Sequence, residues 1–475
     1  MDKKDFPTAI EFYSKAISKY ENFEDAYINR GICNMLLDSM QKGENDFSKV
    51  LSLNHAKNIA YLERGICRLF QKNYTGAISD FDIYIQLNPD TARAYYFRSK
   101  TKALMKDYSG ALADANKSIQ LDPTNPDAYT IRAGIRTELD NNADVESDYN
   151  KALALDSNYM EAMEGLARLY LMRMDIEAAF EIQKRAILLY PDFAWVYNLR
   201  GLISGMNGDS TGAHSDFNKA LQLDSGYYET WMNLGHYYAA QGQFADAIQA
   251  YSKYIEHEPL NSKAYYVRGI AKSMMGENAQ ALTDLNKTIE LEPGFAPAYL
   301  NRAHIYYSRY DYPHSLDNYN TFIRLEPDLP DGYLGRFHVY MVYRNNNAAL
   351  EDITKALKLD PLNPKSYYLR GLLNSYENNY QEAMADFSKA IELMPDYAEA
   401  YFMRGCMLVD LKKYQAAMAD LNKAIALDPE YYDAYHKRGT VYLLQGKKTE
   451  GCEDLYKAKD LGDPFADGLI RENCQ

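Results

Sequence analysis

The chain has 475 residues, of which 47% are hydrophobic and 25% charged, a composition typical of a folded protein. Its formal net charge is −14 and it has no long cluster of lysine and arginine, which disfavours nucleic acid or an anionic membrane surface as its partner. No apolar stretch approaches the roughly 18 residues that span a bilayer, and the first residues lack the apolar core of a signal peptide.

Residues 1–23 have the apolar spacing of one amphipathic helix, with Phe6, Ala9, Tyr13 and Ala16 lying three and four residues apart. In the register of the repeat that follows, these residues match only the second half of a repeat. We therefore expect them to form helix B of a truncated N-terminal repeat and the sequence to come from a longer array.

From residue 24 onward the chain repeats itself every 34 residues. Each repeat has an aromatic residue at position 4 and small residues at positions 8 and 20, as in Tyr27, Gly31 and Gly43, and a proline near position 32 closes most repeats. The thirteen predicted repeats, numbered one to thirteen below, are residues 24–57, 58–91, 92–125, 126–159, 160–193, 194–227, 228–261, 262–295, 296–329, 330–363, 364–397, 398–431 and 432–465.

Each repeat is predicted to hold two amphipathic helices, A and B, of roughly 12 to 14 residues. Glycine or alanine at positions 8 and 20 lets the two helices approach closely, and the proline stops helix B. One such hairpin cannot bury its own apolar faces, whereas stacked neighbours can. The predicted fold class is therefore all-α, an array of stacked antiparallel helix pairs.

This pattern resembles the tetratricopeptide repeat, and the resemblance covers all thirteen repeats. It implies a right-handed superhelical solenoid whose A helices line a concave groove. It also implies a non-catalytic scaffold that holds a protein partner, as an extended peptide or a helix, in that groove.

Two positions differ from the family pattern together. Position 7, usually leucine in the family, is arginine in eleven repeats, and position 23 is aspartate in ten of these, while Arg302 faces Asn318. Because a guanidinium fork matches a carboxylate, we predict a salt bridge from helix A to helix B within each repeat, with a ladder of anion sites as the alternative. The predicted pairs are Arg30–Asp46, Arg64–Asp80, Arg98–Asp114, Arg132–Asp148, Arg200–Asp216, Arg268–Asp284, Arg336–Asp352, Arg370–Asp386, Arg404–Asp420 and Arg438–Asp454.

At the C-terminus, Asp463 and Pro464 are expected to open a short helix that runs through Asn473. Residues 466–475 are predicted to be the remainder of this helix, which caps the last hydrophobic face.

The five cysteines, an odd number without a CxxC motif, indicate neither a disulfide framework nor a zinc site. We expect free thiols on apolar helix faces, which suits a reducing compartment and favours the cytoplasm. Export stays open if an N-terminal segment is missing. The cysteines are Cys33, Cys67, Cys406, Cys452 and Cys474.

No constellation of catalytic residues stands out. The sequence has no glycine-rich phosphate loop, no HExxH and no GxSxG, so we predict neither an enzyme nor a cofactor. His304 and His338 occupy position 9 of neighbouring repeats, where stacked helices place them roughly 8–10 Å apart. That separation is too large for a shared ion, and no metal site is predicted.

In the family, residues at positions 2, 5, 6, 9, 12 and 13 face the ligand. The lysine and asparagine clamp of chaperone-binding members is absent, and the asparagine ladder of the sugar-transferase members is represented only by Asn29, Asn233 and Asn301. Because these positions carry 11 acidic and 6 basic residues, we expect an apolar or basic segment as partner.

The candidate partner-binding residues are the apolar, aromatic and histidine side chains at these positions, several of which could instead pack on the adjacent helix. Alternatives are a self-associating structural array and a tyrosine-lined groove for glycan or cell-wall fragments; the oligomeric state is left open. The candidates are Trp195, Leu202, Met206, Met232, His236, Tyr266, Ile270, Met274, His304, Tyr307, His338 and Met341.

Overall fold

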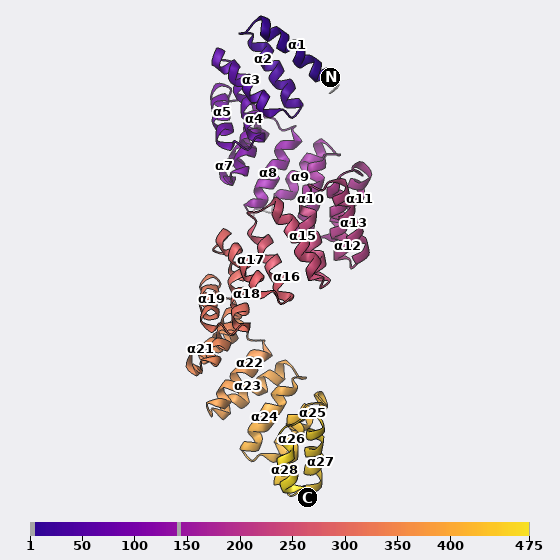
Figure 1. Ribbon diagram of the computed structural model, residues 1–475, viewed down its shortest axis with the longest axis vertical. Helices are drawn as coiled ribbons and strands as arrows, with labels where there is room; N and C mark the ends of the chain where they lie inside the picture. Colours follow the sequence, from indigo (N-terminus) through magenta and orange to yellow (C-terminus); the bar gives the residue numbers. More distant parts are fainter. Residues whose placement is uncertain (1–4, 140–143, 475) are drawn as a thin grey trace. The chain divides into compact units, whose positions relative to one another are not determined.

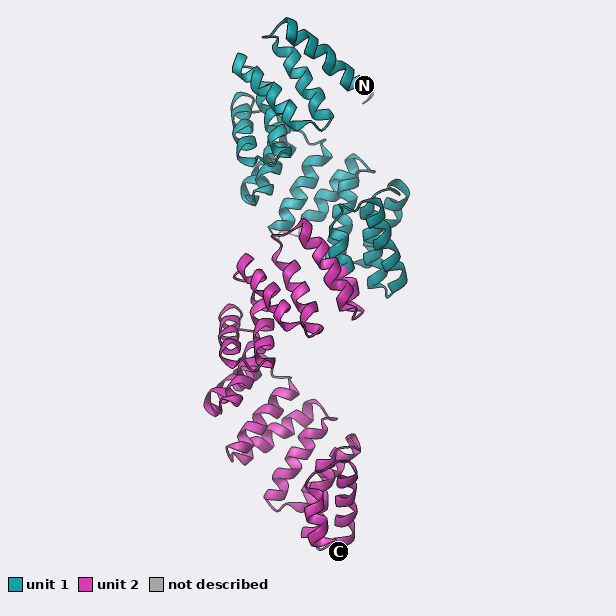
Figure 2. Ribbon diagram, viewed as in Figure 1, with its two compact units in different colours: residues 1–234 teal, residues 235–475 magenta. Residues whose placement is uncertain are grey.

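The computed structural model describes residues 5–139 and 144–474, and all the regular secondary structure in this part of the chain is helical (Figure 1). The chain divides into two compact units, residues 1–234 and 235–475, called here the N-terminal body and the C-terminal body (Figure 2). Each is described by itself. Helix α14, Glu229–Ala240, contains the boundary between them.

In the N-terminal body the even-numbered helices are the A helices of the repeats and the odd-numbered ones are the B helices. These helices are α1 Phe6–Lys19, α2 Glu24–Leu36, α3 Met40–Leu53, α4 Asn58–Phe70, α5 Tyr74–Leu87, α6 Ala92–Leu104, α7 Tyr108–Leu121, α8 Pro126–Glu138, α9 Val145–Leu155, α10 Met160–Met172, α11 Ile176–Leu189, α12 Ala194–Met206 and α13 Ser210–Leu223.

The C-terminal body continues the same alternation and ends on one extra short helix. Its helices are α15 Phe244–His257, α16 Ser262–Met274, α17 Asn278–Leu291, α18 Ala296–Ser308, α19 Tyr312–Leu325, α20 Pro330–Val342, α21 Asn346–Leu359, α22 Pro364–Tyr376, α23 Tyr380–Leu393, α24 Ala398–Asp410, α25 Tyr414–Leu427, α26 Tyr432–Leu444, α27 Lys448–Asp460 and α28 Ala466–Asn473.

The turn from helix A to helix B follows one design. In the twelve repeats whose position 15 the structure describes, this residue takes the left-handed conformation, with φ of 81° at Gly208 and of 61° at Tyr310. The next residue caps helix B in several repeats; for example, Asp107 accepts a hydrogen bond from the backbone N–H of Gly110 at 3.0 Å. The apolar periodicity is therefore interrupted between helix A and helix B, at a sharp turn followed by a helix cap.

The two helices of a repeat touch where position 8 meets position 24. A Cβ atom added to Gly371 would lie 2.8 Å from Cε1 of Phe387, whose side chain is fully buried. Gly31 and Gly65 meet Phe47 and Phe81 in the same way. Glycine at position 8 thus makes room for a phenylalanine ring that closes the core of the repeat.

Two repeats solve the same packing problem differently. Where position 8 is alanine and position 24 is tyrosine, the tyrosine ring reaches the A helix of the next repeat. Tyr149 lies against Gly165, and Tyr319 lies against Gly335, so that a Cβ atom at either glycine would overlap the ring. The tyrosines belong to repeats four and nine, and the repeats that follow them, five and ten, are the two with glycine at position 6.

Helix α28 covers the outer face of the last repeat, where Ala466 and Ile470 are buried against Leu455 and Ala458. At its end, Cys474 forms a disulfide with Cys452 of α27, with an S–S distance of 2.04 Å. The expectation that all five cysteines are free thiols is wrong for this pair, because the fold-back of α28 brings together residues that are 22 apart in sequence.

The other three cysteines are free: Cys33 and Cys67 are buried and Cys406 is half-buried. Burial raises the pKa of the Cys67 and Cys406 thiols to about 12. Among the described residues, no helix is both long and apolar enough to cross a membrane.

Candidate functional site

An arginine on helix A grips an aspartate on helix B in ten repeats. The arginine Nη2 lies 2.6–2.8 Å from Oδ1 and its Nε lies 2.7–3.0 Å from Oδ2, which is the bidentate geometry of a guanidinium on a carboxylate. The aspartate side chains are only 1–10% exposed. These carboxylates face an internal partner, which leaves no ladder of open anion sites at the arginines.

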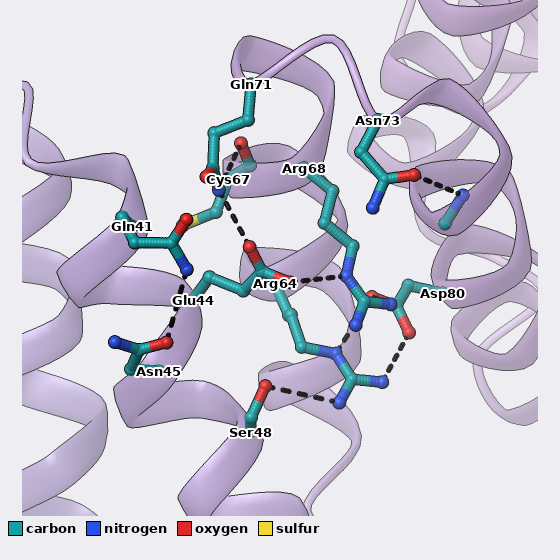
Figure 3. A network of polar contacts seen from close by, with 11 residues as sticks. Gln41, Glu44, Asn45, Ser48, Arg64, Cys67, Arg68, Gln71, Asn73 and Asp80 are labelled. Atoms are coloured by element: carbon teal, nitrogen blue, oxygen red, sulfur yellow. Dashed lines mark hydrogen bonds and ion pairs between the residues drawn. The ribbon is translucent and has the colours of Figure 1, made fainter.

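The same aspartate often holds a second donor from position 11 of helix A. Figure 3 shows Arg64 and Arg68 converging on Asp80, with Arg68 also bound to Glu44 of the preceding repeat at 2.8 Å. Gln71 completes this network through Glu44 at 2.8 Å. In repeats three and eight the second donor is Lys102 or Lys272.

The position 7 arginines make two further kinds of contact that the sequence analysis missed. Its guanidinium lies over the tyrosine three residues earlier, 5.2–5.8 Å from the ring centroid in all eleven repeats that carry the arginine. In nine of these repeats Nη1 donates to the residue sixteen positions back, on helix B of the preceding repeat, such as Ser48 for Arg64 and Asp82 for Arg98. The recurring short polar residue at position 25 is the signal that indicates this contact.

Arg302 shows that the pair does not need two charges. Its Nε donates to Oδ1 of Asn318 at 2.7 Å, and its Nη1 donates to Asn286 at 2.7 Å. Burial lowers the pKa of this arginine, whereas in repeat ten the hydrogen bond that Arg336 donates to Asp352 raises the pKa of Arg336.

Repeat five lacks the arginine and carries a different polar contact. Arg168 of α10 lies 3.0 Å from Glu229 of α14 and 2.9 Å from Glu164, and the hydroxyl of Tyr227 lies 3.0 Å from Glu164 and 3.1 Å from Glu229. The contact joins repeats five and seven, which are not consecutive. Because the Arg168 side chain is 54% exposed, solvent screens this pair and its contribution to stability is small.

Trp195 is not a surface residue, which corrects its assignment to the partner-binding face. Its side chain is 5% exposed and belongs to a core cluster with Val196, Leu199 and Ile203 of its own helix and with Met163 of the preceding repeat. The indole ring centroid lies 6.4 Å from that of Tyr190. A large apolar side chain at the start of α12 is drawn into the junction between repeats because it buries more apolar surface there than beside the groove.

The other candidates of the N-terminal body are less buried. Leu202 and Met232 are half-buried, and Met206 is exposed. Asn198 and Asn233 occupy positions 5 and 6 of consecutive repeats and bond to each other at 3.0 Å. The amide of Asn233 is therefore used within the array.

In the C-terminal body the remaining candidates lie on the A helices α14, α16, α18 and α20. His236, Met274, His304 and His338 are exposed, while four other side chains are half-buried. Tyr307 and His338, from neighbouring repeats, contact each other with ring centroids 6.4 Å apart. We call the set from repeats eight to ten the A-helix face: Tyr266, Ile270, Met274, His304, Tyr307, His338 and Met341.

The A-helix face is almost free of charge. At its six ligand-facing positions, repeats eight to ten carry only Lys263 and Asp331, both at position 2. The packed helices partly desolvate the rings of His304, His338 and His236 and thereby lower their pKa, which favours the neutral form at pH 7. Asn301 donates to the Tyr266 hydroxyl at 3.1 Å and is thus used within the array too.

The histidine rings pack on neighbouring aromatic rings. His304 lies edge-on to Tyr319, with centroids 5.6 Å apart, and His236 Nδ1 lies 3.0 Å from the Tyr251 hydroxyl. Among the residues that the structure describes, no three His, Cys, Asp or Glu side chains come together in a set suited to a metal ion.

The comparisons with known proteins agree with the repeat pattern. Residues 92–125, 228–261 and 364–397 each match a family model described as tetratricopeptide repeat, and residues 405–446 match one described as TPR repeat. The first three ranges are predicted repeats three, seven and eleven.

Two curated proteins resemble short parts of the chain. It is 38% identical over 87 residues to the probable biofilm formation methyltransferase WspC of Pseudomonas putida, which covers 18% of this chain and 20% of that protein. It is 28% identical over 97 residues to anaphase-promoting complex subunit 3 of Schizosaccharomyces pombe, covering 20% of this chain and 15% of that one. The aligned parts therefore span a fifth or less of these relatives.

Among solved structures, the crystal structure of the APC/C hetero-tetramer Cut9-Hcn1 aligns with 96% of this chain and 98% of that one, at 14% identity and a TM-score of 0.49. The matched repeats lie in a chain in which A and B helices alternate throughout the described residues. The chain is a tetratricopeptide-repeat protein.

Proposed function

We propose that this protein is a non-catalytic scaffold that binds a protein partner, and that an extended peptide or a helix of the partner lies on the A-helix face of the C-terminal body. The observation that carries the proposal is the A-helix face itself, where accessible aromatic, histidine and methionine side chains recur on consecutive A helices almost without charge. Aromatic side chains anchor partners, and methionine adapts to irregular apolar surfaces. The charges that flank the face are few, so an apolar segment suits it best.

The test is a pull-down from the lysate of the source organism with three proteins: wild type, His304→Ala/Tyr307→Ala/Met341→Ala, and Leu362→Ala. Leu362 is 72% exposed and lies outside the A-helix face, so its variant is a control for the loss of exposed apolar surface elsewhere. A partner that is retained by wild type and by Leu362→Ala but lost by the triple variant supports the proposal. With the isolated partner segment, the triple variant should bind at least tenfold more weakly in calorimetry.

If all three proteins retain the same partners, the A-helix face is not the binding surface. If none is retained and the mass in sedimentation rises with protein concentration, a self-associating array replaces the proposal. A ligand that survives protease treatment of the lysate would instead favour glycan binding.

Acidification should weaken the C-terminal body in a way that depends on the histidines of the A-helix face. Partial desolvation by the packed helices lowers the folded-state pKa of His304 and His338, so below the unfolded value of about 6.5 the unfolded chain binds more protons and stability falls as the pH falls. We expect the melting temperature to drop between pH 7.5 and 5.5 by less in His304→Leu/His338→Leu than in wild type. Leu202 and Leu372 already occupy the equivalent position 9 elsewhere, so leucine suits this site. An identical drop in both proteins would contradict the expectation.

A further inference from the structure

Helix α28 is too short to hold its place by itself. It has eight residues, whereas isolated helices below roughly 12–15 residues are marginal in water. Its buried contacts are those of Ala466 and Ile470 with the α27 residues Leu455 and Ala458, and Leu469 packs beside them. Because this apolar contact is small, the position of α28 also depends on the contacts at its two ends.

The start of α28 is fixed by polar contacts. Asp463 accepts a hydrogen bond from the backbone N–H of Phe465 at 2.8 Å through Oδ1, and its other carboxylate oxygen lies against Nδ1 of His436 in α26. These contacts orient the entry into the helix. They do not reach its last turn.

The end of α28 is fixed by a covalent bond. Cys474 is the residue that caps the helix, and its Cα lies 5.6 Å from that of Cys452, within the usual range for a disulfide of about 4.4–6.8 Å. The bond closes a loop of 22 residues that contains the whole connection from α27 to α28. Both cysteines are half-buried, so a small reductant can reach the sulfurs, in contrast to the buried Cys33 and Cys67.

We propose that Cys452–Cys474 is a redox lock on helix α28. In the oxidised chain the bond holds the helix over the outer face of repeat thirteen. A dithiol reductant transfers two electrons and two protons to the bond, leaving two cysteine thiols and an oxidised cyclic disulfide. The helix end is then released, and Leu455 and Ala458 become accessible.

The state of the lock follows the surroundings of the protein. Oxidising compartments keep such a bond closed, and the glutathione and thioredoxin systems of the cytosol open it. The stability of a repeat array is a sum of repeat and interface contributions, so opening the lock weakens repeat thirteen first and leaves distant repeats unaffected.

The test combines a thiol count with hydrogen exchange on the full chain. Air-oxidised protein, denatured without reductant, should expose three thiols, and after reduction five. The amides of α28 and of the facing side of α27 should exchange at least tenfold faster in reduced wild type and in Cys474→Ser than in the oxidised protein. Exchange in repeats one to ten should not change.

Two control variants make the result specific. Cys406→Ser should keep the response to reductant, whereas Cys452→Ser/Cys474→Ser should exchange fast in α28 with or without it. Five thiols in the air-oxidised, denatured chain would overturn the proposal, because no bond would then form. Slow exchange of α28 after complete reduction would overturn it as well, since the helix would then stay in place without the bond.

Discussion

We expect Asp284→Ala to destabilise repeat eight by about 3–5 kcal/mol, the range for removing one partner of a buried ion pair. The Asp284 side chain is 4% exposed, and its two oxygens hold Arg268 at 2.7 and 2.8 Å and Lys272 at 2.7 Å. Alanine leaves both cations without their acceptor, and their own side chains are only 16% and 12% exposed. Thermal melting, together with hydrogen exchange of α16 and α17, measures the loss.

The matched control is Asp284→Asn. In repeat nine the equivalent residue, Asn318, accepts a hydrogen bond from Arg302, so an amide fits the site. Asp284→Asn should therefore lose clearly less stability than Asp284→Ala. An unchanged melting temperature in Asp284→Ala would show that the bridge contributes nothing.

The second large effect is expected from Gly335→Ala, which should destabilise the junction of repeats nine and ten by about 1–3 kcal/mol, as overpacking of a core does. The added methyl group would overlap the ring of Tyr319, which is only 2% exposed and belongs to a close-packed interior. In an exposed helix the same change would stabilise by about 1 kcal/mol, so the sign of the effect reports the contact.

A double variant tests the cause. Leucine occupies position 24 at Leu285, Leu421 and Leu455, and each of these is followed by a larger residue than glycine at position 6 of the helix ahead. Tyr319→Leu/Gly335→Ala should therefore be more stable than the sum of the two single variants predicts. Strict additivity in chemical denaturation would mean that the two residues do not compete for space.

The regular part of this fold could be predicted from the sequence because it depends on neighbours in the chain. Glycine at Gly371 and phenylalanine at Phe387 meet within one hairpin, and the 34-residue spacing repeats that meeting. The A-to-B pairing of Arg268 with Asp284 has the same local origin. The helix pairs and the family therefore follow from spacing alone.

The rest depends on how one repeat stacks on another, which spacing does not encode. Trp195 stands at a position that carries charged residues in other repeats, but its side chain turns into the junction with repeat five. Cys452 and Cys474 meet because α28 folds back on α27, a path that no cysteine count indicates. The side-chain amides of Asn233 and Asn301 donate hydrogen bonds to the preceding repeat, and these contacts depend on how the helices stack.

The position 7 arginine contacts residues on both sides of it in the sequence, which restricts how the number of repeats can change. Arg98 reaches sixteen residues forward to Asp114 and sixteen residues back to Asp82, so its partners belong to two consecutive repeats. Removing or duplicating a segment of 34 residues brings a new arginine into the same reach of the same two kinds of partner. Any other length places it beside residues of the wrong kind. Only insertions and deletions of whole repeats therefore keep these contacts. The same condition applies to gene duplication and to the design of shorter or longer arrays.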